Sequence, residues 1–233
     1  MNKLKYSICL FLLVQGIHAQ EIPENEYGLP VIEDVDLYLE TVERNSDNRL
    51  VDLDALIPFV VIDVKYATID NFTGQQLYPY PGAYLRYPAA VALRSAQEEL
   101  NEKGLGLKVW DAYRPYAATV LMWDYVEDPR YVADPRNGSR HNRGCAVDVT
   151  LIDLETGEEL PMPTSYDDFT EKAHIDYDDL PEVVMHNRAL LIDVMRRHGF
   201  EPLASEWWHF DYKDWREFDL MDLSFDELGE IVE

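Results

Sequence analysis

Two short segments, far apart along the chain, constrain its fold more than any other part of the sequence. The first contains His141 and Asp148 on either side of Gly144. The second contains Glu206 and His209, separated by two tryptophans. Two imidazoles and two carboxylates in such compact runs are suited to one shared site. The sequence therefore predicts a fold in which these distant segments meet.

The residue types in the two segments favour a zinc site. Two His and one Asp supply the nitrogen and oxygen donors that Zn²⁺ accepts in a tetrahedral arrangement. Three protein ligands leave the fourth position for water, which is typical of a catalytic rather than a structural site, and bound zinc lowers the pKa of that water to about 7. We therefore expect one Zn²⁺ per chain, held by His141, Asp148 and His209.

Glu206 is the candidate general base beside this metal. It stands three residues before His209, and it could take a proton from the attacking water and pass it to a leaving amine. Glu206 and His209 would lie on a predicted strand, residues 206–212, where side chains three positions apart face opposite sides. The sequence therefore predicts a bend or bulge in this strand, so that both side chains reach the metal.

Further motifs, in a fixed order, surround these two segments. With them, the patterns Ser-x-His-x-x-Gly-x-Ala-x-Asp and Glu-Trp-Trp-His resemble the zinc D-alanyl-D-alanine dipeptidases of the VanX type, over roughly residues 55 to 215. That family is related to the zinc DD-carboxypeptidases and to the hedgehog signalling domain. The additional motifs are Lys65-Tyr66-Ala67-Thr68, Asn71-Phe72-Thr73-Gly74, Trp110-Asp111-Ala112-Tyr113-Arg114-Pro115, Met162-Pro163-Thr164-Ser165-Tyr166-Asp167 and Asn187-Arg188-Ala189-Leu190-Leu191.

The resemblance implies an enzyme that hydrolyses the peptide bond of D-Ala-D-Ala or a similar small dipeptide. It implies that Arg114 stabilises the oxyanion of the tetrahedral intermediate, where a pre-placed charge lowers the barrier. It also suggests that Ser139 and Asp167 hold the ends of the dipeptide, with Asp168 as an alternative to Asp167, and that Tyr66 lines the pocket.

Two other functions remain open at this point. Related metalloenzymes with the same ligands cut peptidoglycan stems as DD- or LD-carboxypeptidases or as endopeptidases. A non-catalytic zinc-containing binding protein is the second alternative. Glu206 and Arg114 in their motif contexts argue against the second, because a binding protein needs neither a base nor an oxyanion partner.

The N-terminus has the pattern of a secretory signal peptide over residues 1–19. Lys3 and Lys5 precede an apolar run at residues 8–14, which is too short to span a bilayer, and Ala19 ends a plausible cleavage site. We therefore expect an exported protein, periplasmic or secreted, without a membrane anchor after cleavage. Cleavage would leave Cys145 without a disulfide partner, as a small packed side chain.

The charge of the chain limits its partners. Its formal net charge is −25, so nucleic acid and anionic membranes are disfavoured. Repulsion of anionic polymers favours a small diffusing substrate, such as a dipeptide. The sequence does not indicate an oligomeric state.

We expect an acidic N-terminal arm at residues 20–50 and a single zinc-peptidase domain at residues 51–233, with an acidic C-terminal extension. Helices and strands alternate irregularly, which favours an α+β fold with a central antiparallel sheet flanked by helices. The resemblance implies the hedgehog/DD-peptidase fold. Strands are predicted at residues 59–66, 105–113, 146–151 and 206–212, and helices at 88–103, 116–126 and 181–198.

Overall fold

The computed structural model describes residues 21–232, and the expected signal peptide at residues 1–19 lies outside that range. The helices are α1 (Val35–Arg44), α2 (Leu53–Leu56), α3 (Tyr87–Asn101), α4 (Tyr116–Tyr125), α5 (Glu182–Arg197) and α6 (Phe225–Ile231). The strands are β1 (Val31–Ile32), β2 (Leu50–Asp52), β3 (Val61–Ile62), β4 (Tyr84–Arg86), β5 (Leu105–Asp111), β6 (Ala146–Asp153), β7 (Phe200–Leu203), β8 (Glu206–Tyr212) and β9 (Leu220–Met221).

A five-stranded sheet in the order β3-β5-β6-β8-β7 forms the centre of the molecule. The pairs β5–β6, β6–β8 and β7–β8 are antiparallel, which confirms the predicted α+β class and the antiparallel centre. The edge strand β3 pairs parallel with β5, so the complete sheet is mixed. The chain between β3 and β5 contains α3, which supplies the long crossover that a parallel pair requires.

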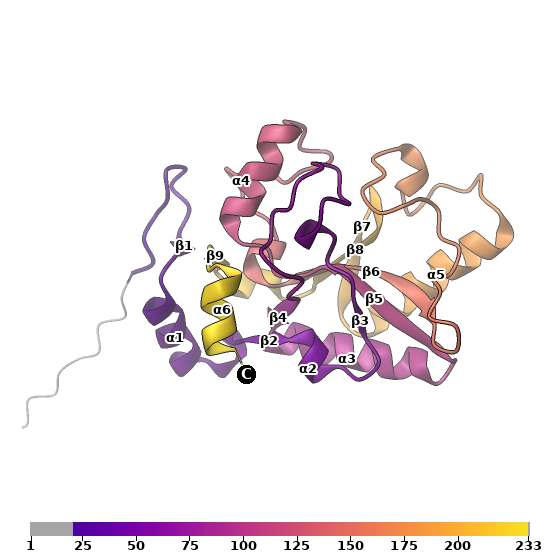
Figure 1. Ribbon diagram of the computed structural model, residues 1–233, viewed down its shortest axis with the longest axis horizontal. Helices are drawn as coiled ribbons and strands as arrows, with labels where there is room; N and C mark the ends of the chain where they lie inside the picture. The colour runs from indigo at the N-terminus through magenta and orange to yellow at the C-terminus, as the bar shows by residue number, and fades with distance from the viewer. Residues whose placement is uncertain (1–20, 233) are drawn as a thin grey trace, which may run out of the picture.

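Two long helices cover one face of the sheet. Figure 1 shows α3 below the strands and α5 at their right, in contact with α3 and β7, whereas α4 and a group of loops lie above the strands. The apolar stripe predicted on α3, formed by Ala89, Leu93, Ala96 and Leu100, is fully buried. Helix α3 ends shortly before Gly104, which has the left-handed conformation (φ 73°) that favours glycine.

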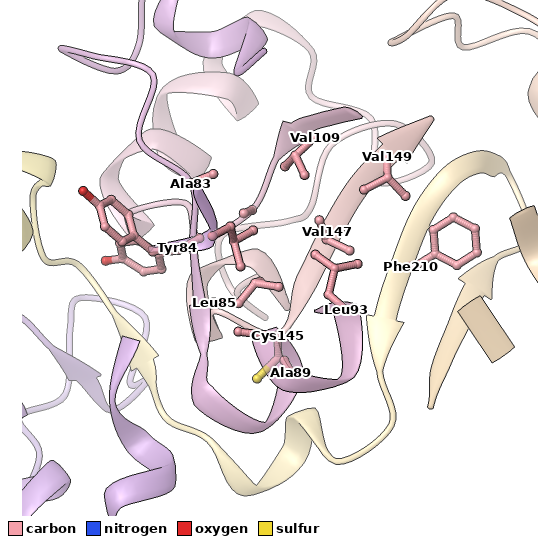
Figure 2. Packing of buried hydrophobic residues seen from close by; sticks show 14 of the residues in the cluster. Ala83, Tyr84, Leu85, Ala89, Leu93, Val109, Cys145, Val147, Val149 and Phe210 are labelled. Carbon is pink, nitrogen blue, oxygen red and sulfur yellow. The ribbon is translucent and has the colours of Figure 1, made fainter. Parts of the chain in front are cut away.

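Strand β6 separates the two faces. Val147 and Val149 point into the apolar layer between the sheet and α3, together with Leu93 and Cys145 (Figure 2). Because side chains alternate along a strand, Asp148 projects to the opposite face. The apolar face of β6 therefore holds the core, and its other face is free to carry chemistry.

The predicted strand at residues 59–66 is only partly formed. Only β3, Val61–Ile62, pairs with the sheet, and a 3₁₀ turn, Lys65–Ala67, follows. Phe59 has a left-handed backbone (φ 67°) and is 72% exposed, so it cannot extend the strand. A β-rich composition predicts a strand only where a neighbouring strand or core covers it.

Both terminal segments contribute to the core. In α1 the buried side chains include Leu37 and Tyr38, and in α6 they include Phe225 and Leu228. Strand β1 pairs parallel with β9 and thereby joins the two ends of the described chain. Among residues 21–232 no helix has the length and apolar character needed to cross a membrane.

Candidate active site

The three predicted metal ligands lie together on the face of the sheet opposite α3 and α5. One donor atom each from His141, Asp148 and His209 falls within 4.8 Å of the others, and all three side chains are buried. The Oδ1 atom of Asp148 lies 3.5 Å from His141 Nε2 and 3.0 Å from His209 Nδ1. Two imidazole nitrogens and one carboxylate oxygen thus converge as a zinc site requires.

Strand pairing and one tight turn create this convergence. Asp148 on β6 stands directly opposite His209 on β8, so the two side chains are cross-strand neighbours on one face. His141 begins a 3₁₀ turn that ends at Gly144, whose φ is 65°. A Cβ at position 144 would lie 2.7 Å from Leu50 Cδ2, so both backbone and space require glycine there.

The remaining ring nitrogen of each histidine has its own partner. His141 Nδ1 lies 2.6 Å from the carbonyl oxygen of Ala112, which can only accept a hydrogen bond, so Nδ1 carries the proton. His209 Nε2 lies 2.9 Å from Oδ1 of Asp211. Each histidine thus presents its other ring nitrogen, His141 Nε2 or His209 Nδ1, to Asp148, as metal ligands do when an outer acceptor fixes the ring. The residues present fit a bound zinc ion.

Glu206 reaches the same place through the predicted irregularity. The register of β7 and β8 shifts between Pro202 and Leu203, and Leu203 pairs with Glu206 itself. Glu206 Oε2 consequently lies 4.0 Å from His209 Nδ1. Burial raises the pKa of Glu206 to about 7, while His209 acts to lower it and Asp148 to raise it. A carboxyl with this pKa can both take and return a proton near neutral pH.

Arg114 enters the site just beyond the end of β5. Its side chain is nearly buried, and its Nη2 and Nε atoms donate hydrogen bonds to Asp111 Oδ2 at 2.7 and 3.0 Å. Its guanidinium carbon also lies 5.2 Å from the ring centre of Tyr66. Arg114 is thus a fixed cation, held on one side by a carboxylate and on another by an aromatic face.

One cavity of about 460 Å³ connects the predicted residues. Its walls are formed by loops above the sheet and by residues of β6 and β8. Every site residue predicted from the sequence lines it: Tyr66, Arg114, Ser139, His141, Asp148, Asp167, Glu206 and His209. The structure therefore brings all of them together, and their individual roles stay predictions.

Asp167 and Tyr66 contact each other at this cavity, since the Tyr66 hydroxyl lies 3.2 Å from each carboxylate oxygen. Asp167 has a left-handed backbone (φ 56°), a conformation that few residues other than glycine adopt and that is often found at functional sites. Burial raises its pKa well above the usual range, and Asp148 adds to this effect. Asp168 does not line the cavity, and its carboxylate instead accepts a hydrogen bond from the amide of Thr170.

Ser139 has a structural role in addition to its place in the cavity wall. Its hydroxyl accepts a hydrogen bond from the amide of His141 at 3.2 Å. Its own amide donates to Asn142 Oδ1 at 2.7 Å, and the Asn142 side-chain amide donates to the carbonyl of Arg114. Ser139 and Asn142 therefore tie the turn that carries His141 to the segment that carries Arg114.

Three supporting residues were missed by the sequence analysis: Asp111, Tyr166 and Asp211. The Tyr166 hydroxyl donates to Asp148 Oδ2 at 2.8 Å. Asp211 could have been found, because it stands two residues after His209 on a strand and so shares its face. Asp111 had a weaker signal, as an acidic residue three positions before Arg114. Tyr166 lies within the motif at residues 162–167 that supports the resemblance, but no periodic pattern indicated a role for it, because it lies in an irregular loop.

The sequence is similar to a family of peptidases and to individual dipeptidases. Residues 46–225 match the sequence model of a peptidase family described as D-ala-D-ala dipeptidase. A D-alanyl-D-alanine dipeptidase of Escherichia coli is 38% identical over 167 residues, which cover 72% of this chain and 86% of the relative. One from Enterococcus faecium is 33% identical over 185 residues, covering 70% of this chain and 90% of the relative.

Comparisons with solved structures give weaker similarities. An LD-carboxypeptidase, LdcB, superposes with a TM-score of 0.39 at 21% identity, covering 64% of this chain and 70% of that one. The D,D-dipeptidase VanXYg, in complex with a phosphinate analogue of D-Ala-D-Ala, gives a TM-score of 0.37 at 17% identity, covering 71% and 66%. Both TM-scores lie below 0.5, so the assignment to a family rests on the sequence comparisons.

Proposed function

The chain belongs to the peptidase family described as D-ala-D-ala dipeptidase, and on this premise we propose that it hydrolyses the peptide bond of D-Ala-D-Ala or a closely similar small dipeptide with the help of one zinc ion. The observation that carries the proposal is the convergence of His141, Asp148 and His209 beside Glu206 in one cavity. A base next to a three-ligand metal site is an arrangement that supports metal-assisted hydrolysis of a peptide bond.

The proposed metal is zinc, held by His141, Asp148 and His209. Asp211 and the carbonyl of Ala112 fix the two imidazole rings. When bound, zinc supplies Lewis-acid chemistry, because it lowers the pKa of a water molecule and polarises a carbonyl oxygen.

Glu206 is the proposed base. It takes the proton of the water that attacks the scissile carbonyl carbon, and it delivers this proton to the nitrogen of the leaving D-alanine as the C–N bond breaks. Its pKa of about 7 suits both transfers. No covalent intermediate with the protein is needed.

Arg114 and the cavity wall bind the remaining groups of the substrate. The Arg114 guanidinium lines the cavity, where it can donate hydrogen bonds to the oxyanion that develops on the scissile carbonyl. The buried Asp167 suits the ammonium group of a free dipeptide, because this cation would lower the raised pKa of Asp167 and restore its negative charge. The hydroxyls of Ser139 and Tyr66 can serve either end. A requirement for the free ammonium would separate a dipeptidase from a carboxypeptidase.

The test is release of D-alanine from D-Ala-D-Ala and from N-acetyl-D-Ala-D-Ala by zinc-loaded protein. We expect cleavage of the free dipeptide alone and a fall in kcat of at least about 10³-fold in Glu206→Gln. Glu201→Gln is the matched control, because it makes the same change at an exposed position on β7 and should keep wild-type kcat.

Each alternative has its own outcome in this assay. Cleavage of the acetylated substrate would assign the chain to the carboxypeptidases. Failure to cleave either substrate, with zinc bound, would favour longer wall peptides or a binding function. Glu206→Gln within a few-fold of wild type would remove Glu206 from the mechanism.

We also propose that the protein is exported, to a periplasm or to the medium. The support is the sequence of residues 1–19, with basic Lys3 and Lys5 before a short apolar run. The test is N-terminal sequencing of the protein after cell fractionation. A mature form that begins at Gln20 outside the cytoplasm would support export, and an intact N-terminus in the cytoplasm would contradict it.

A further inference from the structure

Asp111 is a buried carboxylate with an ordered partner for each of its oxygens. It ends β5 and is 0% exposed. Its Oδ2 atom accepts hydrogen bonds from Nε and Nη2 of Arg114 at 3.0 and 2.7 Å, and its Oδ1 atom accepts one from the Tyr78 hydroxyl at 3.0 Å. A charge in such surroundings is costly unless it is fully paired. The three donors satisfy this requirement.

The contact with Asp111 sets the orientation of the Arg114 guanidinium. The two hydrogen bonds, from Nε and Nη2 to the single oxygen Oδ2 of Asp111, restrict the guanidinium more than one bond would. Within residues 21–232 the third nitrogen, Nη1, forms no hydrogen bond, and Arg114 lines the cavity beside the metal ligands. The face that Asp111 leaves free is therefore the one available to a substrate.

Tyr78, the third donor, is held in place by the C-terminal helix. Its ring is 1% exposed and lies 4.6 Å, centre to centre, from the ring of Phe225, the first residue of α6. Ser224 and Glu227 form a capping box that fixes the start of this helix. Helix α6, which is remote from Tyr78 in the sequence, thus helps to position the Tyr78 hydroxyl.

We propose that Asp111 is a positioning residue for Arg114, and that α6 stabilises this arrangement through Phe225 and Tyr78. The inference rests on the proposed function, because the purpose of a fixed Arg114 is to meet the oxyanion of the reaction. It adds a buried chain of contacts, from the C-terminal helix to the cavity, that acts through Arg114 without touching the substrate.

A double-mutant cycle tests the first link. In zinc-loaded protein we expect Arg114→Ala to lower kcat by about 10²–10³-fold and Asp111→Asn by about 10–100-fold, with KM within a few-fold. Asp111→Asn added to Arg114→Ala should cost little more, because the group that it positions is already absent. Independent, multiplicative losses in the double variant would overturn the proposal, since a purely structural role predicts them.

Two tyrosine variants test the second link. Tyr78→Phe removes only the hydroxyl that reaches Asp111, and we expect kcat to fall about fivefold. Tyr84→Phe is the matched control, because the Tyr84 ring also lies near Phe225, at 5.9 Å, and its hydroxyl has no hydrogen bond to Asp111. Equal effects of the two variants on kcat would contradict a role for the Tyr78 hydroxyl.

A readout without substrate separates this inference from the proposed function. In ¹H–¹⁵N spectra of the zinc-loaded wild type, the Arg114 Nε–H should exchange slowly with solvent, because it is buried against Asp111. Asp111→Asn should accelerate this exchange, and Tyr84→Phe should not. Inactivity of the wild type on every dipeptide would refute the proposed function alone, whereas a fast-exchanging Nε–H in the wild type would refute the positioning role alone.

Discussion

The two faces of strand β6 have opposite requirements, although their residues alternate along one short sequence. Val147 and Val149 pack into the apolar layer over α3, where only shape and hydrophobicity matter. Asp148, between them, has its carboxylate among His141, His209 and the Tyr166 hydroxyl. The comparison teaches that a rigid strand can hold a costly polar cluster when its other face is a well-packed core.

The cost of the polar face also differs from that of the apolar one. Burial of the valines is favourable in itself, at roughly 25 cal/mol per Å² of apolar surface. Burial of Asp148 and Glu206 is unfavourable unless other groups compensate, and the pKa of Glu206, raised to about 7 by burial, records this. We therefore expect substitutions on the polar face to affect mainly activity, and substitutions on the apolar face to affect mainly stability.

The largest expected effect comes from the polar face. Asp148→Asn keeps the size of the side chain but removes the negative charge and weakens one metal ligand. We expect zinc affinity to fall and kcat/KM to decrease by at least about 10³-fold, with Tm within a few degrees of the wild type. Zinc content by mass spectrometry and steady-state kinetics measure the two effects. Normal zinc content and full activity in Asp148→Asn would contradict the role of the polar face of β6 in activity.

The neighbouring residue should give the converse result. Val149→Ala shortens a fully buried side chain on the apolar face, and we expect the free energy of unfolding to fall by about 1.5–3 kcal/mol. The kcat of the zinc-loaded, folded fraction should stay within about twofold of wild type. Urea denaturation and kinetics on the same preparation check this, and a large fall in kcat would show that the core transmits strain to the site.

The apolar face and the metal ligands were the parts most predictable from sequence. The stripe on α3 and the alternation along β6 follow from periodicity, and the irregularity at Glu206 followed from the need for two side chains to share one face. No role was predicted for Asp111 or Tyr166, because only tertiary packing brings Tyr78 to Asp111 and Tyr166 to Asp148. The prediction of a strand over residues 59–66 was wrong outside Val61–Ile62, because the rest of that segment has no partner strand.

The smallest expected effect comes from a polar contact between α3 and α5, on the side of the sheet that holds the apolar core. Glu99 on α3 accepts hydrogen bonds from Arg197 and His198 at the end of α5. These hydrogen bonds lower the pKa of Glu99 to about 2, and the one from Arg197 contributes most. The contact is partly exposed, so solvent screens it. We expect Glu99→Gln to lower the free energy of unfolding by about 0.5–1 kcal/mol at neutral pH, without a change in kcat.

The pH dependence of this effect follows from the direction of the shift. A carboxylate whose pKa is lowered in the folded state stabilises the fold above its unfolded pKa of about 4.3, and this contribution is lost as the pH falls toward 2. The difference in stability between wild type and Glu99→Gln should therefore shrink over this range in urea titrations. A difference that stays constant from pH 6 to pH 3 would exclude the ion pair as its cause.

The buried position of Cys145 has a practical consequence for following the protein in solution. Its thiol is fully buried, and burial raises its pKa to about 12, so it is protonated and inaccessible in the folded state. In a chain produced from residue 20 onward it is the sole cysteine. A cysteine introduced on the surface, for example at the exposed residue Ile69, would then be the one group that a thiol-reactive fluorophore labels, with the native thiol left in place. The label would leave the buried core around Cys145 unchanged.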